Sequence, residues 1–232
     1  MNSMLDRTVD LILKAVGPVV AIVFPVTLWA VFFWVPTDAG LGLSQRIFYY
    51  HMPGAVISFV AFALAGVSSL AYLRTGTSGW DHAASSAVAV GMLFATIVLA
   101  TGSIWARTAW GTWWTWDARL TSTLFIFLLF VGYLIMRDSV IDPDQRARFS
   151  AVIGIMGLVL VPFIHLTVYL FRTLHPDPTL IKPSAPSMPG VMLVTLLSSM
   201  VVFILLYVGF LTQRYAVATL QEMREEEMLR DS

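Results

Sequence analysis

Six long apolar stretches, separated by short polar connectors, dominate the chain of 232 residues. A helix that crosses the hydrocarbon core of a membrane needs about 20 mostly apolar residues. Stretches of about this length lie at about 16–35, 54–73, 83–104, 120–136, 150–171 and 190–212. The pattern predicts an all-α integral membrane protein, a bundle of six transmembrane helices that forms a single domain over residues 1–232. The charged residues in the tail 213–232 predict a solvated helix.

The composition agrees with a membrane protein and excludes several kinds of chemistry. Charged residues make up 12% of the chain and the mean hydropathy is +0.79, whereas soluble domains contain about 25% charged residues. The formal net charge of zero argues against a nucleic acid partner. Because the chain has no cysteine, disulfides and thiolate metal sites are excluded. It also lacks a Walker A motif, so energy from ATP would have to come from another subunit.

An even number of spans places both termini on the same side of the membrane. Of the fourteen Lys and Arg residues, nine fall on that side and five on the other. Because cytoplasmic loops carry the excess of positive charge, we expect both termini in the cytoplasm. The stretch at residues 105–119 then faces outward, which in a bacterium is the periplasmic side of the inner membrane.

This stretch, residues 105–119, contains five of the eight tryptophans. Trp110, Trp113 and Trp114 have the spacing that places three side chains on one face of a helical turn, so we expect an aromatic platform for a flat, apolar ligand. Trp105 and Trp116 complete the cluster. The alternative is an aromatic belt that anchors helix ends at the membrane surface, although a belt needs fewer tryptophans.

Two of the four histidines are expected on the same outer face as the tryptophans. His51 precedes Met52 and Pro53 at the start of the second span, and His175 follows the fifth span. Axial histidines in apolar surroundings are one way in which proteins hold heme, so the pair predicts a heme site with both imidazoles as iron ligands. Taken singly, each histidine is more often an interface residue, and Met52 is an alternative ligand. His82 is expected to be a solvated or capping residue, and His165 to bond a neighbouring helix.

Heme also carries two propionates, for which the outer face offers several cations. Arginine binds carboxylates through two parallel hydrogen bonds, so we expect one or two of these cations to hold the propionates. Arg119 is the least free of them because Asp117 is close enough to compete. The candidate cations are Arg46, Arg107, Arg119, Arg172 and Lys182, and the acidic residues on the same face are Asp38, Asp117 and Asp177.

The sequence WGTWWTWDARLTS at residues 110–122 resembles the signature loop of the heme-handling proteins of cytochrome c maturation. The six-span length is similar to the heme exporter protein C type of that superfamily. The resemblance covers essentially the whole chain and implies that His51 and His175 ligate the iron of heme b. The chain departs from the family in Tyr169-Leu170-Phe171, where the family often has paired tryptophans; a changed packing contact is expected there.

The resemblance also implies a function and partners. Proteins of this type bind heme at the outer surface and pass it to a periplasmic heme chaperone. An ATP-binding cassette transporter and a very small single-span membrane subunit assist in releasing the loaded chaperone. We therefore expect a heme-delivery protein of the bacterial inner membrane that is not itself an enzyme.

Three alternatives remain open from the sequence. The first is a transporter that moves heme or another amphipathic solute across the bilayer, which would need a polar route near the midplane. The second is a membrane electron carrier with heme between its helices, for which only His165 lies within a span. The third is a scaffold that gathers maturation subunits and binds no pigment.

Overall fold

The computed structural model describes residues 2–175 and 188–230, which are almost entirely helical. Each of the six helices lies in a region long and apolar enough to cross a membrane, which confirms the predicted all-α membrane fold. A π-helical turn over Ala30–Trp34 follows the first helix, and a 3-10 turn over Leu43–Ile47 precedes the second. The helices are α1 (Asn2–Trp29), α2 (Phe48–Thr75), α3 (Ser78–Trp110), α4 (Ala118–Ser139), α5 (Pro143–Leu170) and α6 (Gly190–Arg230).

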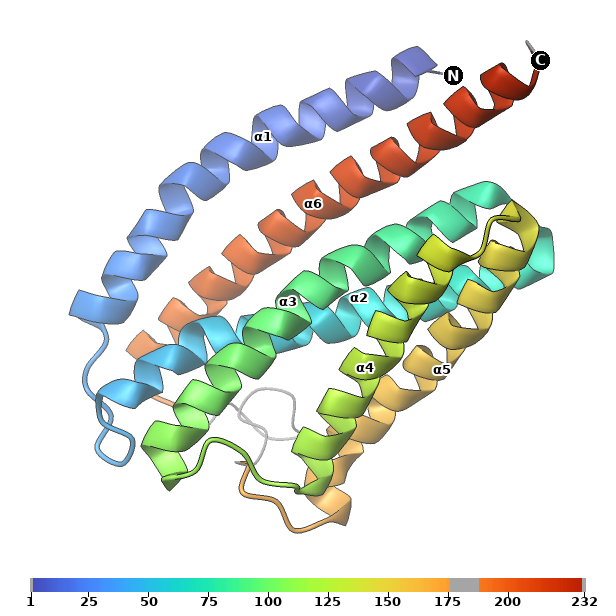
Figure 1. Cartoon of the computed structure of the whole chain (residues 1–232). Helices are drawn as coiled ribbons and strands as arrows, with labels where there is room; N and C mark the ends of the chain where they lie inside the picture. Colours follow the sequence, from blue (N-terminus) through green and yellow to red (C-terminus); the bar gives the residue numbers. More distant parts are fainter. Residues whose placement is uncertain (1, 176–187, 231–232) are drawn as a thin grey trace.

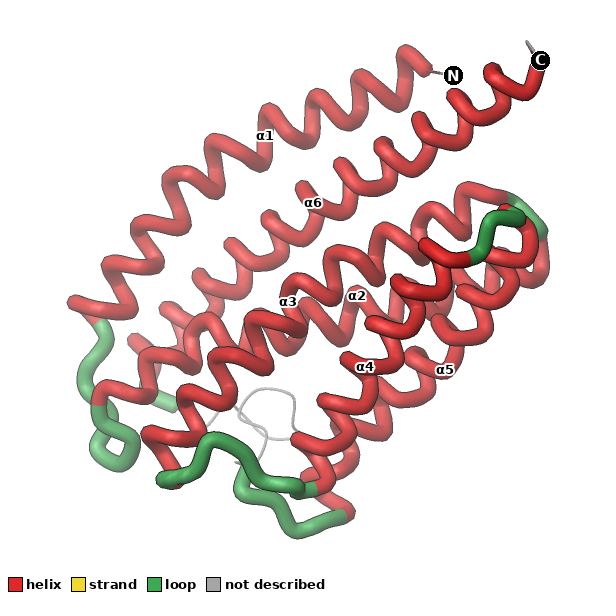
Figure 2. Tube along the Cα trace, viewed as in Figure 1, coloured by secondary structure: helices red, strands yellow, loops and turns green. Residues whose placement is uncertain are grey.

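The helices form a four-helix bundle with a second layer beside it. In the bundle, α2 packs against α3 and α5, and α4 packs against α5. The second layer consists of α6, which contacts α2 and α3, and α1, which lies along α6. Both termini and the α2–α3 and α4–α5 connections lie at one end, here called the terminal end (Figure 1). The opposite end, here called the loop end, carries residues 35–42, 111–117 and 171–175 (Figure 2).

The helix boundaries follow local capping residues and extend beyond the apolar stretches. Gly76 and Gly111 end α2 and α3 in the left-handed conformation, with φ of +68° and +75°, a region that suits glycine. Asp117 and Asp142 cap α4 and α5 by accepting hydrogen bonds from the backbone amides of Leu120 and Gln145. Hydropathy detects only the part of a helix that faces lipid. The span predicted at 83–104 is therefore the central part of a longer helix, α3, which continues into the polar residues on both sides.

The bundle is held together by close backbone approach and by aromatic packing. Gly66 of α2 faces Gly154 of α5 so closely that a Cβ at position 66 would lie 2.8 Å from the carbonyl oxygen of Gly154. Small residues at such crossings let helices approach each other within a membrane. Phe62 of α2 stacks on Phe130 of α4 with ring centroids 4.3 Å apart, and both are buried in the largest core cluster.

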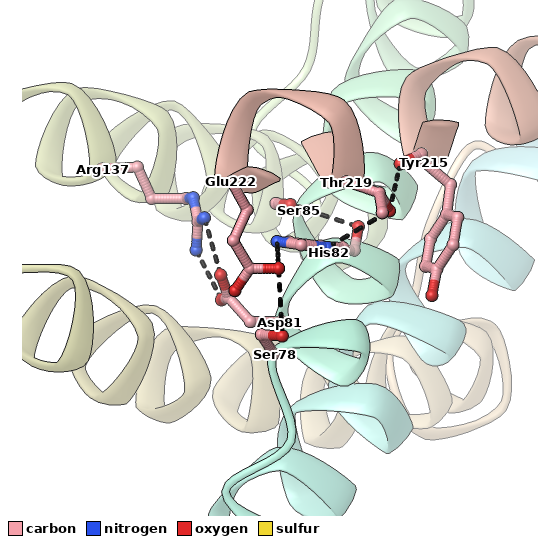
Figure 3. Close-up of polar contacts among 8 residues, drawn as sticks. All are labelled: Ser78, Asp81, His82, Ser85, Arg137, Tyr215, Thr219 and Glu222. Carbon is pink, nitrogen blue, oxygen red and sulfur yellow. Dashed lines mark hydrogen bonds and ion pairs between the residues drawn. The ribbon is translucent and has the colours of Figure 1, made fainter. Parts of the chain in front are cut away.

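A partly buried polar cluster joins four helices at the terminal end, and Figure 3 shows its members on α3, α4 and α6. Asp81 of α3 accepts hydrogen bonds of 2.6 and 2.8 Å from the guanidinium of Arg137 on α4. Arg137 also donates to the hydroxyl of Ser150 on α5 at 3.1 Å. The side chain of Glu222 on α6 lies beside Asp81 and accepts from Ser78 at 3.2 Å. The cluster therefore connects α3 with α4, α5 and the distal part of α6.

His82 belongs to this cluster, whereas the sequence led us to expect a solvated or capping residue. Its Nε2 lies 3.6 Å from the carboxylate of Glu222, and its Nδ1 lies 3.4 Å from the hydroxyl of Thr219. The reason is that α6 continues past its apolar stretch and covers His82, which is buried. The tail after residue 213 is thus helical, but part of it packs on α3.

The crossing of α2 and α5 predicts different effects for two glycine substitutions. Replacing Gly66 with alanine should lower the free energy of unfolding by about 1–3 kcal/mol, because the added carbon meets backbone that cannot move aside. Replacing Gly132 of α4, where a Cβ would meet nothing within 4 Å, should leave it unchanged or raise it by about 0.5 kcal/mol. Thermal unfolding in detergent, followed by tryptophan fluorescence, measures both. Equal stability of the two variants would contradict the close approach.

The buried ion pair predicts a second difference in stability. Replacing Asp81 with alanine should cost about 3–5 kcal/mol, because it leaves the largely buried Arg137 without its counter-charge. The matched control is Asp10→Ala, which breaks the ion pair with Lys14, whose two side chains are 55% and 73% exposed. An exposed pair is worth only about 0–1 kcal/mol. Chemical unfolding of both variants in mixed micelles provides the comparison, and a similar loss in each would show that the buried pair has no special role.

Candidate ligand-binding site

A cavity opens among α2, α3 and α4 at the loop end and has an empty volume of about 880 Å³, part of it open to solvent. Its walls are mostly apolar, and its few polar side chains include two histidines and one arginine. Its lining includes His51, Gly102, Trp105 and Trp110 from α2 and α3, together with Trp114, Arg119 and His175.

The two outer histidines predicted to act together both line this cavity. His51 lies in the first turn of α2, and His175 lies in the segment that follows α5. Folding thus brings into one cavity two imidazoles that are far apart in the sequence.

Three residues in one turn of α3 surround the imidazole of His51. Its Nδ1 lies 3.0 Å from the hydroxyl oxygen of Thr101. Its ring meets the indole of Trp105 edge to face, with centroids 5.7 Å apart. A Cβ at Gly102 would lie 2.9 Å from its Cε1 atom. No local sequence pattern marks Thr101 or Gly102 for this role, because the role depends on how α2 and α3 pack.

The tryptophans of residues 105–119 divide into two groups. Trp105, Trp110 and Trp114 line the cavity, and Trp105 is only 7% exposed. Trp113 and Trp116, by contrast, are 59% and 76% exposed. The predicted single helical face is wrong, because Gly111 ends α3 and the chain runs without helix from residue 111 to 117.

The indole nitrogens of Trp105 and Trp114 are buried and have no hydrogen-bond partner in residues 2–175 and 188–230. A buried donor without an acceptor is costly, so two of them in one cavity wall favour a ligand that brings acceptor atoms. The apolar remainder of the wall favours a ligand with a large apolar surface. Together these features suit an amphipathic molecule with anionic or carbonyl groups.

Of the candidate cations, Arg119 is the one whose side chain lines the cavity. Arg107 and Arg172 are exposed, and the guanidinium of Arg107 donates instead to the carbonyl of Gly111. Arg46 lies over the ring of Phe32, 5.8 Å from its centroid. Lys182 and Asp177 lie outside the described residues. Arg119 therefore supplies the positive charge inside the cavity.

Asp117 competes with a ligand for Arg119 less than expected, because its carboxylate has other partners. No salt bridge joins the two in the described part of the chain. The carboxylate accepts hydrogen bonds from the amide of Leu120 at 2.9 Å and the hydroxyl of Thr115 at 3.2 Å. Burial acts to raise the pKa of Asp117, but these bonds and those from Thr173 and the Arg119 amide hold that pKa below its usual value. The carboxylate is therefore ionised at neutral pH.

Two residues that the sequence offered as alternatives lie away from the cavity. Met52 follows His51 in α2 but packs against the cluster of Val31 and Leu196. His165 lies on α5, where its ring contacts that of Tyr169 at 6.0 Å, and it does not line the cavity. The geometry therefore separates His51 and His175 from the chain's other two histidines.

Comparison with known proteins identifies the family. A family model described as heme exporter protein C matches residues 2–230. The chain belongs to the heme exporter protein C family. It is similar to the heme exporter protein C of Bradyrhizobium diazoefficiens, with 35% identity over 178 residues, 75% of this chain and 66% of that protein. The protein of Haemophilus influenzae is also 35% identical over 194 residues, 84% of this chain and 78% of that protein.

The relative of the same name from Escherichia coli K12 is 35% identical over 153 residues, 66% of this chain and 62% of that protein. The chain thus spans somewhat less than two thirds of the length of two of these three relatives. The six apolar helices and the bacterial relatives make it a multi-pass protein of the bacterial inner membrane. Membership of the family agrees with the resemblance carried by residues 110–122.

Proposed function

We propose that this protein binds heme b at its loop end, with His51 and His175 as axial ligands of the iron. It then delivers the heme to a periplasmic heme chaperone for the maturation of c-type cytochromes. The observation that carries this proposal is that both histidines, distant in the sequence, line one cavity with an aromatic and apolar wall. The relatives, each named heme exporter protein C, give the same ligand class.

The cavity wall fits the chemistry of heme in three respects. Its indoles offer flat apolar surfaces to a porphyrin, and its two imidazoles supply nitrogen ligands of the kind that hold heme iron. Arg119 and the unpartnered indole N–H groups of Trp105 and Trp114 offer donors for the propionates. Of the arginines expected at the propionates, Arg119 is thus the one that we assign; Arg107 and Arg172 stay outside the cavity.

The proposed orientation places both termini in the cytoplasm and the loop end in the periplasm. It rests on the excess of Lys and Arg at the terminal end, and both termini indeed lie together there (Figure 1). In this orientation Trp113 and Trp116 project into the periplasm beside the cavity. We propose that they contact the chaperone, because exposed tryptophans are typical of binding surfaces. An ATP-binding cassette transporter and a small single-span subunit are the further partners that the family resemblance suggests.

The proposed ligands predict a change in the absorption spectrum. Protein purified in detergent and loaded with hemin should show a low-spin heme spectrum. His51→Ala and His175→Ala should each convert it to a high-spin spectrum or lose the pigment, because one axial ligand is missing. His165→Ala is the matched control and should leave the spectrum unchanged. Normal loading of the chaperone by the His51→Ala, His175→Ala double variant would exclude the proposal, and absence of heme from the wild type would favour a scaffold.

The two groups of tryptophans predict a separation between retention and transfer. Trp114→Ala should raise the dissociation constant for heme about tenfold or more, because an aromatic wall is lost. Trp113→Ala and Trp116→Ala should retain heme at wild-type affinity but slow its transfer to the chaperone by a similar factor. Hemin titration gives the affinity, and covalent loading of purified chaperone gives the transfer rate. Identical effects for both groups would show that the division between cavity-lining and exposed tryptophans has no functional meaning.

The alternative that this protein is a heme transporter has its own test. Heme flux into vesicles that contain no partner protein would favour the transporter.

A further inference from the structure

The imidazole of His51 is held from one side by a single turn of α3. Thr101 contacts its Nδ1, Gly102 lies beside its Cε1, and Trp105 meets its ring edge to face. The ring belongs to α2, which packs closely on α3. Its orientation is therefore set by two rigid helices and not by a loop.

The hydrogen bonds of Thr101 determine which nitrogen of His51 carries the proton. The hydroxyl of Thr101 donates to the carbonyl oxygen of Ile97 at 2.7 Å, one turn earlier in α3. A hydroxyl has one hydrogen, so it cannot also donate to His51. The contact of 3.0 Å is then a hydrogen bond from Nδ1–H of His51 to the oxygen of Thr101. A neutral imidazole has a single N–H, so its Nε2 carries a free lone pair.

Gly102 adds a steric reason for the ring position, because a Cβ there would lie 2.9 Å from Cε1, the carbon between the two nitrogens. The absence of that side chain lets the ring approach the backbone of α3.

We infer that Thr101 is a positioning residue that fixes His51 as the Nδ1–H tautomer and thereby presents Nε2 to the ligand in the cavity. The inference rests on the proposed function in one respect, namely that the atom bound by Nε2 is heme iron. The tautomer itself belongs to the protein without ligand. Histidines that bind metals usually donate their other N–H to such a partner, which fixes both tautomer and ring orientation.

The nature of this partner also affects the strength of the iron bond. A carboxylate partner would raise the basicity of the imidazole, whereas Thr101 offers an uncharged oxygen. The imidazole of His51 is therefore a weaker electron donor than one that is paired with a carboxylate. Such a ligand suits a protein that must give its heme away.

The tautomer can be measured without heme. In protein labelled with ¹⁵N-histidine, the four histidines give a spectrum in which His51 is identified by its loss in His51→Ala. We expect a protonated Nδ1 and an unprotonated Nε2 for His51 in the wild type and in Thr101→Ser, which keeps the hydroxyl. Thr101→Val should give a mixture of tautomers. A protonated Nε2 in the wild type, or an unchanged spectrum in Thr101→Val, would overturn the inference.

Heme binding provides the second measurement, with a control on the same helix. Thr101→Val should speed heme dissociation about 10- to 100-fold, as is typical when the partner of a ligating histidine is removed. Thr101→Ser should restore slow dissociation. Thr96→Val is the matched control, because Thr96 makes the same kind of bond to a carbonyl one turn earlier in α3, 2.8 Å from Met92 oxygen, and does not line the cavity. It should bind heme like the wild type.

The outcomes separate this inference from the proposed function. If the wild type binds no heme but shows the expected tautomer, the proposed ligand is wrong and the role of Thr101 stands. If the wild type holds low-spin heme and Thr101→Val releases it no faster than Thr96→Val, the role of Thr101 is wrong and the proposed function stands. Thr101→Val loses its bonds to both Ile97 and His51, whereas Thr96→Val loses one bond, so Thr101→Val should melt somewhat lower. A lower melting temperature with an unchanged tautomer and unchanged heme dissociation would assign Thr101 to stability instead.

Discussion

The hydrocarbon of a bilayer offers no hydrogen-bond partners, and this constraint governs the placement of polar side chains in the bundle. Most of them therefore find a partner within the protein. Hydroxyls inside the helices therefore donate to carbonyls one turn earlier, as Thr96, Thr101 and Ser150 do. The charged pair of Asp81 and Arg137 is bonded through the two terminal nitrogens of the guanidinium, Nη1 and Nη2. Some buried polar atoms have no hydrogen-bond partner in the described residues. Among them, the indole N–H groups of Trp105 and Trp114 are the ones that lie on residues lining the cavity, where a ligand can reach them.

Side chains of α3 make such contacts within the protein at both ends of the molecule. At the terminal end its first turn carries Asp81 and His82, which bind α4 and α6 (Figure 3). At the loop end its last turns carry Thr101, Gly102 and Trp105 against His51. The buried ion pair keeps α3 and α4 together at the terminal end, while the loop end remains open between them as a cavity.

The two histidines proposed to hold the iron are supported in different ways. His51 is set by helix packing, whereas His175 belongs to a segment without regular secondary structure, where its amide donates to the hydroxyl of Thr173 at 3.1 Å. Thr173 in turn hydrogen-bonds Asp117, at the end of the exposed α3–α4 loop. Segments of this kind open at lower free energy than packed helices. In the proposed function, a chaperone that docks on the α3–α4 loop is thus connected to His175 more directly than to His51.

The fold class, the number of spans and the family were all predictable from the sequence. Each of these depends on local patterns, namely apolar stretches long enough to cross a membrane and the run of residues at 110–122. The sequence also allowed the hypothesis that His51 and His175 act together. An even number of predicted spans lies between them, which places both at the same end of the bundle. Boundaries were less predictable, since caps such as Gly76 and Asp142 lie beyond the apolar stretches.

The construction of the site, in contrast, depends on how the helices pack. Gly111 broke the expected helical face of tryptophans, so that Trp114 turned toward the cavity and Trp113 away from it. The burial of His82 and the contact of Thr101 with His51 depend on which helix packs against which. Spacing along one helix cannot reveal such contacts, because the partners lie on helices far apart in the sequence and meet only when the bundle closes.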